Sequence, residues 1–222
     1  MKKERHILVV FPHPDDEAFG VSGTISMHVA NGTPITYACL TLGEMGRNLG
    51  NPPFATRESL PQIRKKELLK AVEAMGIQDL RMLGFRDKTI EFEDDEKMTN
   101  VIEALIAELN PSLVISFYPG YSVHPDHEAT ARAVVRAIAR MDEEARPTLH
   151  CVAFSNNHEQ EIGAANIVIN VEAFAEQKKA AIRAHLSQTA WMLQEMEPKW
   201  NTGDKVALEW LNTERFWTYL FK

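Results

Sequence analysis

Short apolar runs alternate along the chain with longer stretches in which apolar residues recur at helical spacing. Runs such as ILVVF and LVISFY are apolar at nearly every position, which is typical of strands buried on both faces of a sheet. The predicted strands cover residues 7–11, 35–42, 80–83, 113–118, 148–154 and 166–171. The predicted helices cover residues 18–30, 58–75, 93–109, 124–141 and 172–196, and the first three end before Gly or Asn.

This alternation predicts an α/β protein with a three-layer, Rossmann-like architecture, in which helices cover both faces of a mostly parallel sheet. The chain has no internal repeat, no low-complexity tract and no linker rich in Pro, Gly or Ser, so we expect a single domain over residues 1–222. In sheets of this kind, functional sites form in the loops outside the carboxyl ends of the strands. Polar loops that directly follow an apolar run are therefore the strongest candidates for a functional site.

Composition and charge argue against several functions. Of the 222 residues, 45% are hydrophobic and 25% are charged, and the formal net charge of -7 gives no support for binding nucleic acid or an anionic membrane. No segment has the roughly 20 apolar residues that a membrane span needs. The two cysteines, Cys39 and Cys151, lie in apolar runs and provide no disulfide framework. We expect a cytoplasmic protein with neither a membrane nor a nucleic-acid partner.

Two loops rich in histidine and aspartate each follow a predicted strand. One is PHPDDE at residues 12–17, and the other is HPDH at residues 124–127. Histidine nitrogens and carboxylate oxygens are zinc ligands, and a catalytic zinc site uses three protein ligands and keeps one position open. His13 and Asp16 are three residues apart at a helix entrance, which turns both side chains to one side. With His127 they form the expected set of three ligands.

The remaining residues of the two loops are candidates for proton transfer. Asp15 points away from the ligand pair and is the candidate base for the zinc-bound water. His124 precedes His127 by one turn, where it could stabilise the oxyanion or protonate the leaving amine. Asp126 is a candidate for orienting a ligating or catalytic histidine. An Asp-Asp pair after a strand is also a common helix N-cap, so the prediction depends on the two loops occurring together.

These two loops resemble the hallmarks of the LmbE-like, or PIG-L-like, zinc N-deacetylase family, which carries PHPDDE after its first strand and HPDH after a later one. The resemblance extends over nearly the whole chain, through TLGE at residues 41–44, RKKEL at residues 64–68, and Lys178, His185, Ser187 and Gln188. It implies removal of an acetyl group from an N-acetylglucosamine moiety attached to a further group. It also implies the site roles His13, Asp16 and His127 for zinc, Asp15 as base, and His124 at the oxyanion.

The pattern is most similar to the deacetylases of bacillithiol biosynthesis, which act on N-acetylglucosaminyl malate. The resemblance implies that Glu44 and Arg64 contact substrate hydroxyls or a carboxylate. Arg57, like Arg47, would bind the acidic part of the substrate. Tyr121 would contact the leaving side of the substrate. Alternatively, Arg47 and Arg57 are solvated loop residues, and Glu44 caps the loop.

Family members often form trimers or hexamers, so the resemblance also implies a homo-oligomer. All four tryptophans lie in the last part of the chain, where they either pack in the core or form a subunit interface. The role of His185 is open between packing and subunit contact.

Several alternatives remain open. Within the family, the alternative is an amidase acting on bacillithiol S-conjugates. A nucleotide-binding oxidoreductase would share the early strand, but the loop after that strand lacks GxGxxG. A two-metal phosphoesterase would need more bridging carboxylates. A non-catalytic metal-binding protein would tolerate replacement of Asp15. Two nitrogens and a carboxylate suit Fe²⁺ as well as Zn²⁺, so the residues do not decide between the two metals.

Overall fold

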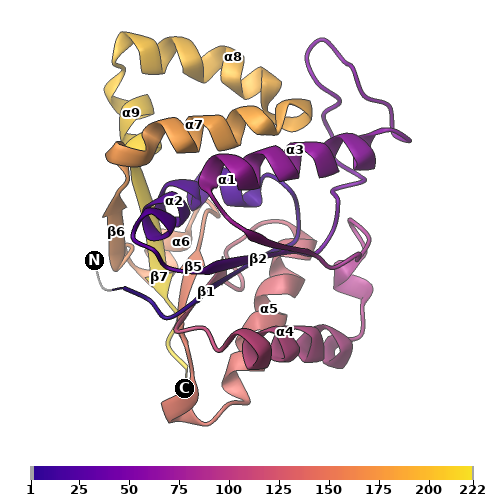
Figure 1. Ribbon diagram of the computed structural model, residues 1–222, viewed down its shortest axis with the longest axis vertical. Helices are drawn as coiled ribbons and strands as arrows, with labels where there is room; N and C mark the ends of the chain where they lie inside the picture. The colour runs from indigo at the N-terminus through magenta and orange to yellow at the C-terminus, as the bar shows by residue number, and fades with distance from the viewer. Residues whose placement is uncertain (1–2, 222) are drawn as a thin grey trace.

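The computed structural model describes residues 3–221, and one seven-stranded sheet runs through them in the order β3-β2-β1-β4-β5-β7-β6 (Figure 1). The strands are β1 (Ile7–Phe11), β2 (Ile35–Cys39), β3 (Asp79–Met82), β4 (Leu113–Phe117), β5 (Thr148–Val152), β6 (Ile167–Asn170) and β7 (Thr213–Thr218). The first five are parallel, and β7 pairs antiparallel with both β5 and β6. The predicted mostly parallel sheet is confirmed.

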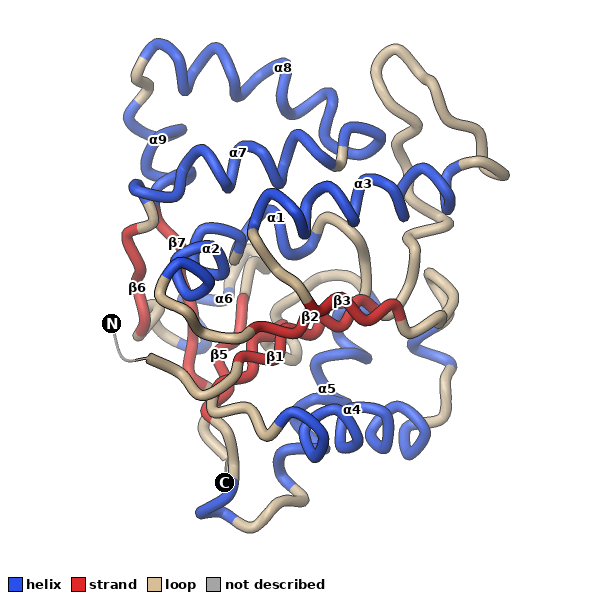
Figure 2. Tube along the Cα trace, in the orientation of Figure 1, coloured by secondary structure: helices blue, strands red, loops and turns tan. Residues whose placement is uncertain are grey.

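Helices cover both faces of this sheet (Figures 1 and 2). One face carries α1 (Asp16–Gly20), α2 (Ser22–Ala30), α3 (Leu60–Met75) and α7 (Ala175–Ala184), with α8 (Leu186–Thr202) packed outside α7. The other face carries α4 (Asp95–Leu109) and α5 (Pro125–Ala139). The short α6 (His158–Ile162) and α9 (Lys205–Asn212) lie near β6 and β7. Each face has its own core cluster, as expected for strands that alternate buried residues between two helical layers. The single domain predicted for residues 1–222 stays a prediction.

Two predicted helices are each divided in two, and a buried glutamate binds main-chain N–H groups after each break. The helix predicted for residues 18–30 breaks at Val21, and Glu214 then accepts the N–H groups of Gly23 and Thr24 in the first turn of α2. The helix predicted for residues 172–196 breaks at His185, and Glu67 accepts the N–H of Ser187 at the start of α8. The unpaired N–H groups of a helix start favour a carboxylate. Glu214 and Glu67 are distant in sequence, so helical spacing alone could not locate the breaks.

The C-terminal part of the chain adds α9 and β7, which the apolar pattern did not predict. Trp200 and Trp217 are each 5% exposed and pack in the core, while Trp191 on α8 is 55% exposed. Trp210 is partly buried and packs against the same core. Core packing therefore accounts for three of the four tryptophans, and Trp191 stays available for an interface. Among residues 3–221, no helix combines the length and apolar character that crossing a membrane requires.

Candidate metal centre and active site

The two histidine-rich loops meet at the point where the chain changes direction across the sheet. From β1 the chain proceeds outward through β2 and β3, then returns to place β4 on the other side of β1. The loops after β1 and β4 therefore leave the same edge of the sheet side by side, which is where open α/β sheets bind ligands. PHPDDE connects β1 to α1, and HPDH begins α5. The predicted meeting of the two loops is confirmed.

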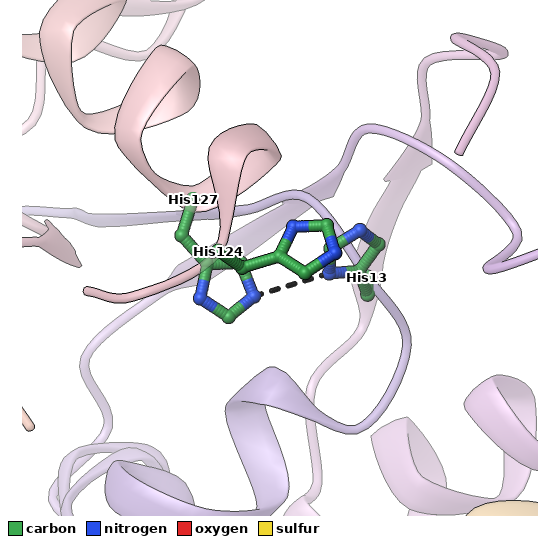
Figure 3. A group of neighbouring side chains, drawn as sticks. All are labelled: His13, His124 and His127. Carbon is green, nitrogen blue, oxygen red and sulfur yellow. Dashed lines mark hydrogen bonds between the residues drawn. The ribbon is translucent and has the colours of Figure 1, made fainter. Parts of the chain in front are cut away.

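The side chains of His13, Asp16 and His127 converge on one point. His13 Nδ1 lies 3.2 Å from His127 Nε2 and 3.4 Å from Asp16 Oδ2. His127 Nε2 lies 3.3 Å from Asp16 Oδ1. Tetrahedral ligands at zinc distances are separated by about 3.3–3.6 Å. The two nitrogens and the Asp16 carboxylate, whose two oxygens each lie beside a different nitrogen, have separations close to this range. Figure 3 shows the rings of His13 and His127 close together, His13 from the loop after β1 and His127 from the first turn of α5.

The partners of each ring fix which nitrogen is available as a ligand. His127 Nδ1 lies 3.0 Å from the carbonyl oxygen of Ser122, so this nitrogen carries the proton and Nε2 has a lone pair. His13 Nε2 lies 3.2 Å from the carboxylates of both Asp126 and Asp87, which leaves a lone pair on Nδ1. Two lone pairs facing each other at 3.2 Å repel unless a cation lies between them. The donor set therefore fits a metal ion.

Two other groups of side chains also come within ligand distance of one another: His13 with His124 and His127, and His13 with Asp87 and Asp126. We favour the set that contains Asp16 because its two carboxylate oxygens lie next to the two nitrogens that have lone pairs. The Asp87 and Asp126 carboxylates face the opposite nitrogen of His13 and orient its ring. The predicted orienting role of Asp126 agrees with this contact.

Electrostatics favours a cation at this point. Burial disfavours the charged form of His13, but the carboxylates of Asp126, Asp16 and Asp87 outweigh it and raise the pKa of His13 well above its usual value. Burial opposes ionisation of Asp16 too, yet His127 and His13 lower the pKa of this carboxyl. The negative charge that holds a proton on His13 would equally attract a metal ion, and metal binding would displace that proton.

Asp15 lies beside this ligand set but outside it. Its backbone is left-handed, with φ of 99°, and its side chain caps no helix. Its Oδ2 instead accepts from Arg64 Nη2 at 2.9 Å. Burial raises the pKa of the Asp15 carboxyl to about 6, against the opposing charge of Arg64. The Asp15 side chain therefore does not act as a helix N-cap. Its carboxylate is available to exchange a proton near neutral pH.

His124 caps the start of α5 with its imidazole. Its Nδ1 accepts the main-chain N–H of Asp126 at 3.2 Å, so the neutral ring carries its proton on Nε2. Burial, reinforced by the nearby rings of His13 and His127, lowers the pKa of His124. The ring centroids of His124 and His13 are 4.9 Å apart (Figure 3). His124 is therefore a neutral hydrogen-bond donor beside the ligand cluster.

The four predicted substrate contacts bind other protein groups in this structure. Arg64 is 3% exposed and donates to the carbonyl oxygens of Gly43 and Pro14 besides Asp15. A Cβ on Gly43 would lie 1.8 Å from the Arg64 guanidinium, so only glycine fits there. The others form these hydrogen bonds: Glu44 with the N–H of Asp87, Arg57 with the carbonyls of Glu44 and Gly46, and Tyr121 with Glu161.

Asp87 and Glu17 are site residues that sequence reasoning missed. Asp87 touches His13 Nε2 and accepts the N–H of Met45, but it lies in a loop with no recognisable motif. Glu17 belongs to PHPDDE and is fully buried, with His185 Nε2 at 2.5 Å. Its place in the hallmark was the signal that could have identified it. The contact also assigns His185 to the interior rather than to a subunit surface, since His185 is itself fully buried.

Backbone strain is concentrated around the ligand cluster. Four residues other than glycine have positive φ within residues 3–221, and three of them adjoin the site. They are Asp15, Lys88, whose N–H donates to Asp126, and Val123, which precedes His124. The fourth, Asn110, ends α4 in a conformation that asparagine commonly adopts there. Strained residues persist only where the surrounding structure holds them, and they gather at functional sites.

A cavity of about 760 Å³ opens on the other side of the ligand pair Asp16 and His127. Aromatic side chains dominate its walls, and Phe117 stacks on the His127 ring at 4.1 Å. The other aromatic lining residues are Phe19, Phe154, Trp210 and Trp217. The lining residues Lys178 and Glu214 form an ion pair at 3.0 Å and are almost fully buried, so neither offers a free charge. Two further charged lining residues, Glu159 and Arg215, are exposed, so the buried part of the cavity is suited to an apolar group.

A mostly parallel sheet with two histidines, an aspartate at ligand spacing and a separate buried aspartate at its switch point fits a metal-dependent hydrolase. Residues 8–138 match the PIG-L family, described as GlcNAc-PI de-N-acetylase. The chain belongs to this family, and it is an enzyme of the de-N-acetylase class.

Two relatives agree with this assignment. The chain is 54% identical over 222 residues to a probable N-acetyl-alpha-D-glucosaminyl L-malate deacetylase 2 of Bacillus anthracis, covering 100% of this chain and 98% of the relative. It is 49% identical over 216 residues to the protein of the same name from Bacillus subtilis, covering 97% and 98%.

Among solved structures, N,N'-diacetylchitobiose deacetylase of Pyrococcus horikoshii has a TM-score of 0.73 at 23% identity, covering 97% of this chain and 84% of that one. The hydratase GalB of Pseudomonas putida has a TM-score of 0.72 at 20% identity, covering 98% and 97%. Because a hydratase and a deacetylase both have this fold, the fold alone does not decide the reaction.

Proposed function

We propose that this protein removes the acetyl group from the N-acetylglucosamine moiety of a small conjugate, with N-acetylglucosaminyl malate as the foremost substrate. The names of relatives that are about half identical and span the whole chain support this substrate. The observation that carries the reaction is the division of labour between neighbouring aspartates. Asp16 joins the ligand cluster, while Asp15 is held apart from it on Arg64.

His13, Asp16 and His127 would hold the metal, for which we propose zinc, with Fe²⁺ as the alternative. Zinc, when bound, polarises the amide carbonyl and makes water a stronger acid. Asp15 accepts a proton from the attacking water, and the Arg64 guanidinium favours the ionised form of its carboxylate and holds it by a hydrogen bond. His124 donates its Nε2–H to the oxygen of the tetrahedral intermediate. The carbon–nitrogen bond breaks, the proton taken up by Asp15 passes to the nitrogen, and acetate and a free amine result.

The predicted substrate contacts at Glu44, Arg57, Arg64 and Tyr121 stay predictions. The hydrogen bonds of Arg57 favour a role in holding the loop at residues 43–58 rather than direct contact. Arg47 in the same loop is exposed and makes no side-chain ion pair within residues 3–221, so we propose it as the contact for a substrate carboxylate.

An amine-release assay tests the proposal most directly. Protein loaded with one equivalent of zinc would be given N-acetylglucosamine, its malate conjugate and bacillithiol S-conjugates, each with and without a chelator. We expect amine release to be fastest with the malate conjugate and to stop when the chelator is added. Equal release with and without the chelator would contradict a metal-dependent reaction, and a preference for free N-acetylglucosamine would contradict the malate assignment.

A second candidate function, cleavage of the amide in bacillithiol S-conjugates, is favoured by the aromatic cavity. An acetyl group would fill only a small part of about 760 Å³, whereas an acyl group with an apolar sulfur substituent would use the aromatic walls. The same assay separates the two functions. The deacetylase predicts the higher kcat/KM on the malate conjugate, and the amidase predicts it on S-conjugates with the largest apolar substituents.

We also propose a cytoplasmic location and a homo-oligomer, a trimer or hexamer. Both cysteines are free and buried, which suits a reducing compartment. The exposed Trp191 on α8 is a candidate interface residue. Analytical ultracentrifugation of the native chain and of Trp191→Glu checks the assembly, because a charge at a subunit interface should shift the sedimentation toward that of the monomer.

A further inference from the structure

Glu17 is a fully buried acid that the reaction described above does not use. Its carboxylate receives three donors: His185 Nε2 at 2.5 Å on Oε1, and the Tyr37 hydroxyl at 2.9 Å and the Asp15 main-chain N–H at 3.1 Å on Oε2. Tyr37 and His185 are themselves fully buried, on β2 and between α7 and α8. Three elements distant in sequence therefore meet at this one side chain.

The contact with Asp15 is the one that bears on catalysis. Asp15 is left-handed, a conformation that residues other than glycine rarely adopt without support. Its carbonyl accepts from Ala18 in α1, whereas its N–H projects to Glu17. The left-handed turn is what sends the Asp15 side chain to Arg64 while the next side chain, Asp16, enters the ligand cluster.

We propose that Glu17 is a positioning residue for the base: its carboxylate, fixed by Tyr37 and His185, holds the Asp15 peptide in the left-handed turn that separates the base from the metal ligand. This inference takes Asp15 as the base proposed above. Glu17 acts through Asp15 and touches neither the substrate nor the metal.

Asp16 is held by a contact that does not involve Glu17. Its Oδ2 accepts the main-chain N–H of His13 at 2.9 Å, in addition to its contacts with the two imidazole rings. Loss of the Glu17 carboxylate should therefore misdirect Asp15 while the metal ligands stay in place. Catalysis and metal binding should separate in a Glu17 variant, which a general loss of structure would not produce.

The experiment compares four variants with the native chain, each loaded with one equivalent of zinc. Glu17→Met keeps the side-chain length but accepts no hydrogen bond. Glu17→Gln keeps one amide oxygen that can still accept from Asp15. Tyr37→Phe removes one of the groups that fix the carboxylate. Glu67→Gln is the matched control. Glu67 is also a buried glutamate, 6% exposed, that accepts a main-chain N–H and a hydroxyl, but both donors belong to Ser187 and neither to Asp15.

We expect Glu17→Met to lower kcat about 100-fold with KM changed by less than about 3-fold, because misplacing a catalytic group by about 1 Å has that effect. Zinc stoichiometry should stay at one per chain. Glu17→Gln should retain within about 10-fold of native kcat, with Tyr37→Phe between it and the native chain. Glu67→Gln should lower the melting temperature while kcat per folded molecule stays native.

A second readout does not need substrate or metal. In the metal-free protein, the Asp15 amide proton donates to a carboxylate and should resonate downfield. It should move upfield in Glu17→Met and stay in place in Glu67→Gln. An unchanged amide shift in Glu17→Met, or a loss of kcat in that variant no larger than in Glu67→Gln, would overturn the proposal. If Glu17→Met does not fold, Tyr37→Phe tests the proposal instead. A native kcat together with a native Asp15 amide shift in Tyr37→Phe would overturn the proposal. If no substrate is cleaved, the proposed function fails, and the amide shift still tests the positioning role.

Discussion

The two sides of the ligand cluster differ in almost every physical respect. On one side, Asp15, Arg64, His124 and Asp126 form a dense set of charged and hydrogen-bonded groups on strained backbone. On the other side, aromatic rings line a cavity of about 760 Å³ whose buried charges are already paired. We propose that the polar side moves protons and that the apolar side accommodates the shape of a substrate.

The two sides of the ligand cluster also come from different parts of the chain. The polar side comes from the loops after β1 and β4, from α3 and from the start of α5, which lie in the region matched by the family. Most of the cavity wall comes from residues after 150, including α9 and β7. We therefore expect the chemistry and the choice of substrate to depend on different parts of the sequence, so that substitutions in one part leave the other largely intact.

The largest effect is expected from removing a ligand on the polar side. Asp16→Ala should weaken zinc binding by more than about 100-fold, beyond the range found for residues that only orient a ligand, and amine release should fall to background. Zinc content after dialysis and the rate of amine release measure this. Asp95→Ala, in an exposed helix start on α4, is the control and should bind zinc like the native chain. Retention of tight zinc binding by Asp16→Ala would remove Asp16 from the ligand set.

A smaller effect is expected from a residue that orients His13. Asp126→Asn should weaken zinc binding or activity by about 10–100-fold. The Asp126 carboxylate accepts a hydrogen bond from His13 Nε2–H, and this bond keeps the lone pair of His13 on Nδ1, where the metal would bind. Competition with a chelator of known affinity measures the change. An effect as large as that of Asp16→Ala would make Asp126 a ligand instead.

Sequence reasoning located the polar side well and the apolar side poorly, for physical reasons. Apolar strands followed at once by histidine and aspartate are local signals, and the parallel pairing of β1 with β4 brings their loops together. The breaks at Val21 and His185, in contrast, depend on glutamates distant in sequence. The strand β7 has the sequence TERFWT, with only two adjacent apolar residues, so a search for continuous apolar runs missed it, and the cavity that it lines was missed too.

The apolar side can be tested without touching the polar side. Gly20 lies on α1 at the cavity, and a Cβ there would make ordinary contact with Val152 at 3.5 Å. Gly20→Leu should fill part of the cavity and lower kcat/KM for bacillithiol S-conjugates with large apolar substituents about 10-fold. Ala107→Leu, on the exposed face of α4, is the matched control. Equal loss on small and large substrates would contradict a role of the cavity in accommodating the acyl group.

The smallest effect concerns strain on the polar side. Val123 is a β-branched residue in the left-handed region, with φ of 65°, and its side chain is 69% exposed. Val123→Gly should raise the free energy of unfolding by about 1 kcal/mol, because relief of the left-handed strain exceeds the entropy that glycine adds to the unfolded chain. Urea denaturation measures the change. A destabilised Val123→Gly would mean that the valine side chain makes stabilising contacts that outweigh the strain.

The central claim is that Asp15 supplies the base while His13, Asp16 and His127 hold the metal. The most direct measurement is the rate of amine release by zinc-loaded Asp15→Asn with the malate conjugate as substrate, alongside its zinc content. The account predicts one zinc per chain, as in the native protein, and a kcat lowered by about 100-fold to 10,000-fold. A native rate with zinc bound would contradict it.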